Sequence, residues 1–375
     1  MKYVFILGLS VNPNSIKRID EFIDHGYNVE AYGFKRDIDV HNKPRGCDIT
    51  IIGAFSNSTR YIQRCKTIYK GIKSVVDRNK TEQCIYYLVG MEVALFFRLI
   101  SKAPYIFEEA DIIHADFKNK IKRNVFECID KYIINRACIS AFRSEGFILY
   151  HFGKKVPNNV ITIANRLNSD IVNFPNAHKN ETDLNKLRVG FVGFIRYKSV
   201  LNFCKVYCNT FPQYEFHFYG VFSSDGNKTV FAELKQYANC YFHGAFVSPN
   251  DLPTIYGNLD LVLSTYDVDC ENVRYAEPNK LCEAMYFETP IIVSSGTFLS
   301  QKVNRLGIGF DINPMNNEEI KSFISSLTAD KLQRARNKMK QINKHDLLSI
   351  NDELFQRIED LAANRIVHSV GFKKS

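Results

Sequence analysis

Two stretches in the second half of the chain carry residues that could hold a phosphorylated ligand. The first, VGFVGFIRYK at 189–198, is an apolar run that ends near Gly193 and leads directly to Arg196 and Lys198. A glycine at the carboxyl end of a buried strand lets the backbone approach a phosphate, and Arg and Lys can then neutralise its charge. A plain strand and loop with solvated charges fits the same letters, and the stretch does not match the GxGxxG dinucleotide fingerprint.

The second stretch, EPNKLCEAMYFETPIIVSS at 277–295, combines a helix start with a carboxylate. Pro278 and Asn279 are expected to open a helix, with Asn279 as its N-cap residue. The unpaired N–H groups at such a helix start favour an anion. Glu283, one turn into the helix, could accept hydrogen bonds from two neighbouring sugar hydroxyls. Its neighbours are apolar, so a merely solvated glutamate is the weaker interpretation.

A third group of polar residues follows a predicted strand at 105–107 in the first half. Glu108 and Glu109 stand side by side, and Asp111 and His114 come soon after them. Two adjacent acids with a histidine could bind an acceptor or handle a proton. An ordinary polar loop after a strand is the alternative.

The ten cysteines include no CxxC pair, and Cys204 and Cys208 stand four residues apart in an apolar stretch, where they could share a helix face. Because no Cys or His spacing is typical of a zinc site, we expect ten reduced thiols in a reducing cytosol rather than a disulfide framework or a metal centre.

Length and composition place these residues in a globular chain. Its 375 residues are 45% hydrophobic and 24% charged, which excludes fibrous and wholly disordered classes and suggests two domains. The balance of 49 basic and 40 acidic residues gives a net charge of +9, which suits anionic partners without choosing among them. The apolar run at 84–100 is short for a membrane span and has Glu92 near its centre, so we expect a strand, a turn and a buried helix there.

Short apolar runs alternate with helical patterns in both halves, which predicts βαβ units and largely parallel sheets. One helix is expected at 118–136, with Val125, Ile129, Tyr132 and Ile133 facing inward. We therefore predict an α/β fold with two doubly wound, Rossmann-like domains that face each other across a cleft.

Four segments are predicted along the chain. They are an N-terminal domain at 1–168, a polar linker at 169–186, a C-terminal domain at 187–346, and a helix with a tail at 347–375. The last helix could also cross back and pack against the first domain.

The sequence resembles a known family at two places, the Gly-Phe-Val-Gly…Arg…Lys stretch and the Pro-Asn-Lys-Leu-Cys-Glu-Ala-Met…Pro-Ile-Ile-Val-Ser stretch. Together they look like the donor-binding half of retaining GT-B glycosyltransferases of the family 4, or group 1, type. Those enzymes build bacterial surface polysaccharides from nucleotide sugars. The resemblance covers 187–345; over the first domain it is limited to the alternating strands and helices and to YIFEEAD at 105–111.

The resemblance implies roles for the donor-binding residues. Arg196 and Lys198 would hold the donor diphosphate near Gly193, and Glu283 would hold the ribose. The loop at 272–280 would cradle the sugar and phosphate through Asn272, Glu277, Pro278, Asn279 and Lys280. The family's two glutamates lie eight residues apart, but the position eight before Glu283 holds Tyr275. Asn272 or Glu277 is therefore the candidate for the sugar contact.

The implied function is transfer of a hexose or related sugar, with retention, from a nucleotide sugar to a lipid-linked or growing glycan in capsule, O-antigen or exopolysaccharide synthesis. Glu109, Asp111 and His114 are the candidate catalytic residues. We expect a cytoplasmic enzyme, in peripheral contact with anionic membrane, that needs no cofactor and binds no nucleic acid. A nucleotide-sugar epimerase with the same two domains, and a non-catalytic nucleotide- or glycan-binding homologue, remain alternatives.

Metal-independent transfer is expected in spite of one acidic pair, Asp267-Val268-Asp269. In the other large glycosyltransferase fold such a DxD binds Mn²⁺ beneath the diphosphate. A second DxD at 37–39 shows how readily the pattern arises in a chain of this composition. We therefore interpret both pairs as loop carboxylates.

Overall fold

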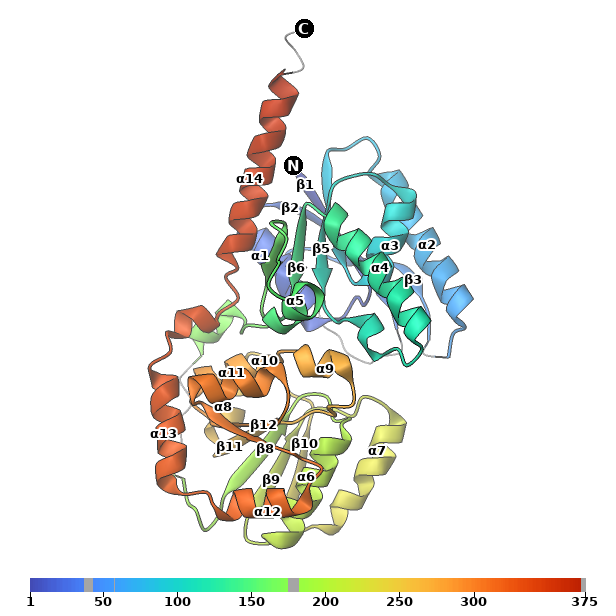
Figure 1. Ribbon diagram of the computed structural model, residues 1–375. Coiled ribbons are helices and arrows are strands. Elements are labelled where there is room, and N and C mark those ends of the chain that lie inside the picture. Colours follow the sequence, from blue (N-terminus) through green and yellow to red (C-terminus); the bar gives the residue numbers. More distant parts are fainter. Residues whose placement is uncertain (37–42, 57, 175–181, 372–375) are drawn as a thin grey trace. The chain divides into compact units, whose positions relative to one another are not determined.

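The computed structural model describes residues 1–36, 43–56, 58–174 and 182–371 (Figure 1). The chain divides into two compact units. Unit 1 comprises Met1–Ala164 and the chain from Ile350 onward, and unit 2 comprises Asn165–Ser349. The predicted linker at 169–186 falls within unit 2, and its central part, 175–181, lies outside the described residues.

Unit 1 is built on a seven-stranded parallel sheet with the strand order β3-β2-β1-β4-β5-β6-β7. The strands are β1 (Lys2–Leu7), β2 (Asn28–Lys35), β3 (Ile49–Ala54), β4 (Cys84–Val89), β5 (Tyr105–Glu109), β6 (Ile139–Phe142) and β7 (Val160–Thr162). Every residue of β4 and β5 is buried, as expected for strands that helices cover on both faces.

Helices cover both faces of this sheet (Figure 1). They are α1 (Pro13–Asp24), α2 (Tyr61–Arg78), α3 (Met91–Ile100), α4 (Lys120–Arg136), α5 (Glu145–Phe152) and α14 (Asp352–Gly371). The strand and helix predicted at 84–100 are confirmed as β4 and α3. No helix within the described ranges is both long and apolar enough to cross a membrane.

The C-terminal helix α14 belongs to unit 1, so the last part of the chain returns to the first domain. Leu354, Phe355 and Ile358 enter the same core as Phe22 of α1, and the rings of Phe22 and Phe355 lie 5.2 Å apart. Just before the helix, Asn351 donates a hydrogen bond to Glu21 over 3.0 Å.

Helix α4 differs from the prediction in the side chains that it exposes. Ile133 is buried as expected, but Val125 is 52% and Tyr132 is 44% exposed. They continue an outward stripe from Ile121, which is 77% exposed, through the exposed thiol of Cys128. The prediction for Val125 and Tyr132 was wrong because hydrophobic spacing shows that a helix has an apolar face without showing whether that face meets the core.

Unit 2 has a six-stranded parallel sheet with the order β10-β9-β8-β11-β12-β13. Its strands are β8 (Arg188–Val192), β9 (Glu215–Tyr219), β10 (Cys240–Gly244), β11 (Leu261–Ser264), β12 (Ile291–Ser294) and β13 (Gly309–Ile312). Strand β13 was not predicted, because it has only four residues, is half-exposed and contains Asp311.

Two layers of helices flank this second sheet (Figure 1). They are α6 (Lys198–Thr210), α7 (Asp225–Phe231), α8 (Leu252–Gly257), α9 (Glu271–Tyr275), α10 (Asn279–Tyr286), α11 (Phe298–Leu306), α12 (Asn317–Ser325) and α13 (Ala329–Lys340). Side chains of α6, α7 and α12 share one hydrophobic core with the strands. The prediction of two Rossmann-like, doubly wound domains is confirmed.

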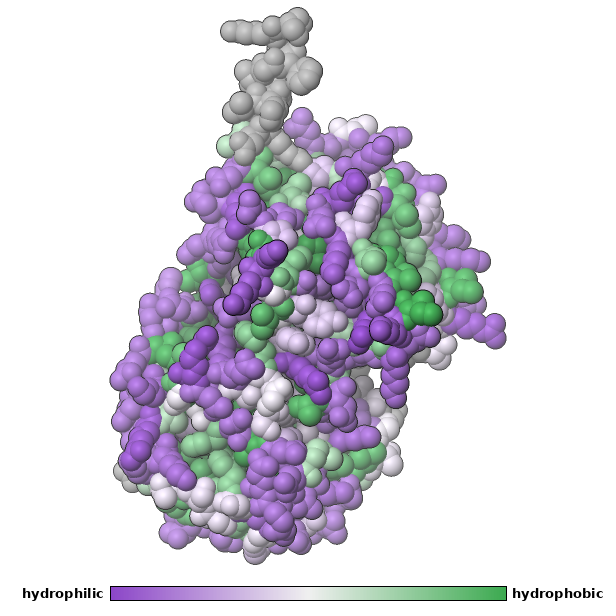
Figure 2. All heavy atoms as spheres, in the orientation of Figure 1, coloured by the Kyte–Doolittle hydropathy of each residue, from purple (hydrophilic) through white to green (hydrophobic). Residues whose placement is uncertain are grey.

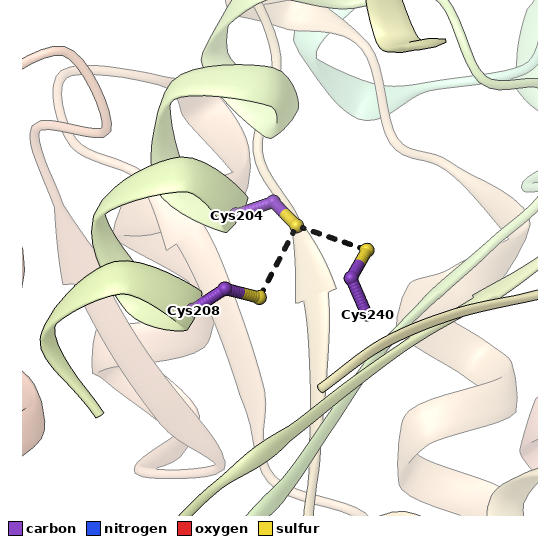
Figure 3. Close-up of side chains that lie close together, drawn as sticks. All are labelled: Cys204, Cys208 and Cys240. Carbon is purple, nitrogen blue, oxygen red and sulfur yellow. Dashed lines mark hydrogen bonds between the residues drawn. The ribbon is translucent and has the colours of Figure 1, made fainter. Parts of the chain in front are cut away.

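Three thiols meet in the core of unit 2 (Figure 3). Cys204 and Cys208 share the buried face of α6, and their sulfur atoms are 3.8 Å apart; the sulfur of Cys240 on β10 lies 3.7 Å from that of Cys204. All ten cysteines are free thiols in the structure. Burial, together with the two neighbouring thiols, raises the pKa of Cys204 well above its ordinary value.

Thiol reactivity should follow this burial. Because Cys128 is exposed whereas Cys204 and Cys208 are buried, a thiol reagent should modify Cys128 first in the folded protein, and the core thiols should react only after denaturation. Peptide mapping after brief modification measures this order, and Cys128→Ser should remove the fastest phase. Early labelling of Cys204 would contradict the packing described here.

Candidate functional site

Two glycines stand at the carboxyl edge of the unit 2 sheet, so the backbone there carries no side chains. Gly193 follows β8 with φ at +127° and Gly220 follows β9 with φ at +134°, a range that side-chain-bearing residues rarely adopt. A Cβ atom on Gly220 would lie only 2.0 Å from the carbonyl oxygen of Gly193. Glycine is therefore required here, and a ligand can approach the backbone closely.

Lys280, at the start of α10, carries a buried ammonium group beside this edge. The residue is 8% exposed, and its Nζ lies 3.3 Å from the point where a Cβ of Gly193 would be. Nζ also lies 4.4 Å from the ring centre of Phe191 and donates a long hydrogen bond of 3.4 Å to the Tyr266 hydroxyl. Within the described part of the chain, no carboxylate forms an ion pair with it.

The surroundings of Lys280 disfavour its charge. Burial lowers the pKa of Lys280 from 10.5 to about 8, and the nearby carboxylate of Glu283 offsets only part of that effect. A buried cation without a paired anion is costly. The arrangement fits a residue whose counter-ion is supplied by an anionic ligand.

A chain of contacts through Tyr197 and Tyr266 connects Arg196 with Lys280. Its guanidinium stacks on the ring of Tyr197 at 4.8 Å and donates a hydrogen bond of 2.5 Å to the Tyr197 hydroxyl. Tyr197 packs edge-on against Tyr266, with ring centres 4.8 Å apart, and Tyr266 accepts the hydrogen bond from Lys280. The loop after β8, the loop after β11 and the start of α10 thus converge.

Glu283 lies one turn after Lys280 on α10 and is half-buried. Its carboxylate accepts a hydrogen bond of 2.6 Å from the hydroxyl of Tyr256 in α8. Burial and the charge of Glu283 raise the pKa of that Tyr256 hydroxyl well above its ordinary value. The tyrosine therefore remains a donor and holds the Glu283 carboxylate in place.

Glu277 has a firm structural attachment within unit 2. It is 4% exposed, and its carboxylate pairs with Lys302 at 2.6 Å. Its carbonyl oxygen accepts a hydrogen bond of 2.8 Å from Asn165. These contacts fix the start of the 277–280 segment.

The N-cap prediction for α10 was wrong. The helix starts at Asn279, Pro278 is the N-cap residue, and no side chain of that residue caps the helix. Pro278 fits because its φ of −81° and ψ of 159° are typical of an N-cap position. Asn279 is exposed, and Asn272 is half-buried on α9.

Asp267, the first acid of the DxD, acts as a cap for α6. Its two carboxylate oxygens accept hydrogen bonds from the backbone N–H groups of Ser199, at 2.8 Å, and Lys198, at 3.2 Å. This satisfies free N–H groups at the helix start, where a negative charge is favourable. The side chains of Lys198 and Asp269 are exposed.

The three candidate residues of unit 1 do not share one surface. Glu109 is 1% and His114 is 0% exposed, whereas Asp111 is exposed. Glu109 and His114 lie in the interior beside Asp130 and His151. The sequence analysis missed these two partners because they come from later helices, at no fixed spacing from the strand.

Comparison with known proteins identifies the fold. No protein-family model and no curated protein matches the chain. Among solved structures, it is similar to sucrose-phosphate synthase from Thermosynechococcus elongatus at 13% identity and a TM-score of 0.70, over 97% of this chain and 100% of the other. The chain has the GT-B fold.

Two further solved structures share this fold. HepE from Anabaena, in complex with UDP-glucose, matches at 15% identity with a TM-score of 0.68 over 96% of this chain and 99% of its own. WaaG, a glycosyltransferase involved in lipopolysaccharide biosynthesis, matches at 12% identity with a TM-score of 0.62 over 92% and 97%. At these identities the similarity establishes the fold alone.

The buried ammonium group predicts a pH-dependent cost to stability. The pKa of Lys280 is about 8 in the folded protein and 10.5 when unperturbed, which at neutral pH destabilises the folded state by about 3 kcal/mol at most. The unfolded chain binds the proton more tightly, so this cost should decline as pH rises above 8 and vanish only above pH 10.5. Lys280→Met should therefore unfold at a higher urea concentration at pH 7, and this advantage should shrink by pH 10.

Parallel urea titrations of both proteins at the two pH values measure the difference. An exposed-lysine variant, Lys321→Met, serves as the matched control. An advantage of Lys280→Met that does not change with pH would contradict a buried, charged Lys280.

Proposed function

We propose that this protein is a nucleotide-sugar-dependent glycosyltransferase and that the carboxyl edge of the unit 2 sheet binds the donor. The proposal rests on the position of Lys280. Its ammonium group is buried and lies beside Gly193, where the backbone carries no side chain. The diphosphate of a nucleotide sugar supplies the missing negative charge. The HepE structure with UDP-glucose shares the fold and supports this class of ligand.

Each residue of the site has a task in the proposed reaction. Lys280 and Arg196 bind the diphosphate, with Lys198 at the rim, and Gly193 lets the phosphates approach the backbone. Charge builds up on the diphosphate as the sugar–phosphate bond breaks, and the buried ammonium of Lys280 and the guanidinium of Arg196 stabilise it. Glu283, held by Tyr256, accepts hydrogen bonds from the ribose hydroxyls.

The sugar itself is assigned to the segment after β11. Asn272 and Pro278–Asn279 are proposed contacts, whereas Glu277 positions the segment through Lys302. We propose transfer of a hexose with retention to a glycan acceptor of a surface polysaccharide, with Asp111 as the exposed acceptor-side candidate. Glu109 and His114 are proposed to act from the interior, by shaping the loop that carries Asp111.

Helices α2, α3 and α4 of unit 1 offer a surface for a lipid-linked acceptor. Figure 2 shows hydrophobic side chains gathered on this part of unit 1. Each helix carries an exposed apolar side chain: Ile62 of α2 is 70%, Leu99 of α3 is 68% and Ile121 of α4 is 77% exposed. The exposed lysines Lys120, Lys122 and Lys131 accompany the stripe on α4. Apolar side chains with a basic rim are suited to the surface of an anionic membrane.

Membrane binding by this surface is a testable consequence. The protein should bind vesicles that contain anionic lipid, and binding should weaken as salt screens the lysines. Ile121→Asp with Val125→Asp should reduce binding about tenfold or more, because both side chains lose apolar contact. Val230→Asp, at an exposed apolar position of unit 2, is the control, and equal binding by both variants would exclude α4 as the docking surface.

The donor site predicts distinct losses for its two main side chains. Arg196→Ala should lower kcat more than donor affinity, because its charge interacts most strongly with the leaving group in the transition state. Glu283→Gln should lower donor use about 10- to 150-fold, the value of a hydrogen bond to a charged group. Steady-state kinetics with each donor measure both.

Matched controls keep these variants interpretable. Arg334→Ala and Glu318→Gln change exposed residues of α13 and α12 and should retain full activity. A panel of UDP, GDP, CMP and ADP sugars in thermal-shift and turnover assays identifies the donor. Glycosyl transfer supports the proposal, whereas epimerised donor, or binding without turnover, would replace it with one of the alternatives.

Donor transfer is proposed to proceed without a metal bound by the DxD. Asp267 is engaged with the start of α6, and Asp269 is exposed. Asp269→Ala should therefore keep wild-type kcat and KM, and added Mn²⁺ should leave both unchanged. Loss of activity in Asp269→Ala with an intact fold would show that this acid holds a catalytic ion.

A further inference from the structure

Four titratable side chains meet in the interior of unit 1, outside the proposed donor site. They are Glu109 at the end of β5, His114 in a 3₁₀ turn (Ile113–Asp116), Asp130 of α4 and His151 of α5. Their side chains are at most 1% exposed. Two carboxylates and two imidazoles in one core require partners that neutralise and satisfy them.

Glu108, the neighbour of Glu109, has partners that neutralise its charge. Glu108 is equally buried, but Arg143 pairs with it at 2.5 Å and Arg18 lies 3.7 Å away. Burial alone would raise the pKa of Glu108, and the two arginines lower it instead. In the described residues, no lysine or arginine pairs with Glu109 or Asp130. Burial and the charges of Asp130 and Asp111 raise the pKa of Glu109 well above its ordinary value.

The distances within the cluster match those between ligands of one ion. Nε2 of His114 lies 3.2 Å from Oδ2 of Asp130, and Nε2 of His151 lies 3.9 Å from the same oxygen. Nitrogen and oxygen ligands at 2.0–2.1 Å around a tetrahedral Zn²⁺ are about 3.3–3.4 Å apart. One ligand atom each of His114, Asp130 and His151 lies within 4.8 Å of the other two, so one ion could contact all three. Glu109 instead forms a hydrogen bond of 2.9 Å with Nε2 of His151.

The hydrogen bonding also leaves room for an ion. Among the described atoms, Nε2 of His114, Oδ1 of Asp130 and Oε2 of Glu109 are buried without a hydrogen-bond partner. His114 thus approaches Asp130 without forming a hydrogen bond, as two ligands of a common cation do. Such unsatisfied buried groups are rare in folded proteins.

We propose that His114, Asp130 and His151 form a structural binding site for a divalent cation of the Zn²⁺ type, with Glu109 orienting His151 through their hydrogen bond. The carboxylates of Asp130 and the nearby Glu109 offset the charge of the ion, and two imidazoles favour zinc-like ions over Mg²⁺ or Ca²⁺. The ion would tie α4 and α5 to the 3₁₀ turn. It would lie in unit 1 and take no part in donor chemistry.

Metal analysis of the full chain, purified with a tag that contains no histidine, tests this proposal. After dialysis against Zn²⁺ and removal of free ion, elemental analysis should find one ion per chain. Replacement by Co²⁺ should give the visible bands of a four-coordinate site without a thiolate charge-transfer band. That band would instead indicate the three thiols of unit 2 (Figure 3) and overturn the assignment.

Two variants and one control locate the ion. His151→Gln and Asp130→Asn should each lose the ion, and added Zn²⁺ should no longer raise their melting temperature. His243→Gln removes an exposed histidine that lies 3.0 Å from His217 and should retain the ion. No stoichiometric ion in the wild-type chain, or full binding by His151→Gln with native circular dichroism, would overturn the proposal.

Discussion

The cost of burying the Lys280 ammonium is the constraint on which the proposed donor site of unit 2 depends. Nothing in the folding of unit 2 needs a charge at that position, and a methionine would fill the space at lower cost. The ammonium is held by a phenyl ring, a tyrosine hydroxyl and the edge of a glycine. None of these contacts neutralises it, which leaves an anionic ligand as the partner that best explains its position.

The parallel sheet supplies the geometry that this charge requires. Strands β8 and β11 are neighbours, so the loops that follow them bring Tyr197 and Tyr266 together. Asp267 then satisfies the start of α6, and Glu277 ties the next segment to Lys302. The carboxylates of Asp267 and Glu277 thus hold the backbone around the site in place. Lys280 and Arg196 form no ion pair with them and can bind an anionic ligand. This division explains how an acidic DxD can lie beside the proposed phosphate site.

The sequence predicted the fold well because each unit repeats a strand, a turn and a helix with clear apolar periods. It also named Gly193, Arg196 and Lys280 as candidate donor-binding residues, which lie close together in unit 2 and whose role stays a prediction. It failed at Val125 and Tyr132, where periodicity could not tell an outward apolar stripe from a core face. It also gave no sign of Asp130 and His151, because contacts between distant segments are set by packing and not by local spacing.

Proton uptake on UDP binding tests the central claim most directly. A bound diphosphate should restore the ordinary pKa of Lys280, so calorimetric titrations at pH 8.5 in buffers of different ionisation enthalpy should reveal uptake of about 0.5–1 proton per UDP. Uridine, which lacks the diphosphate, should cause no uptake. Tight UDP binding without proton uptake at that pH would contradict the account, because Lys280 would then not be the group that the diphosphate neutralises.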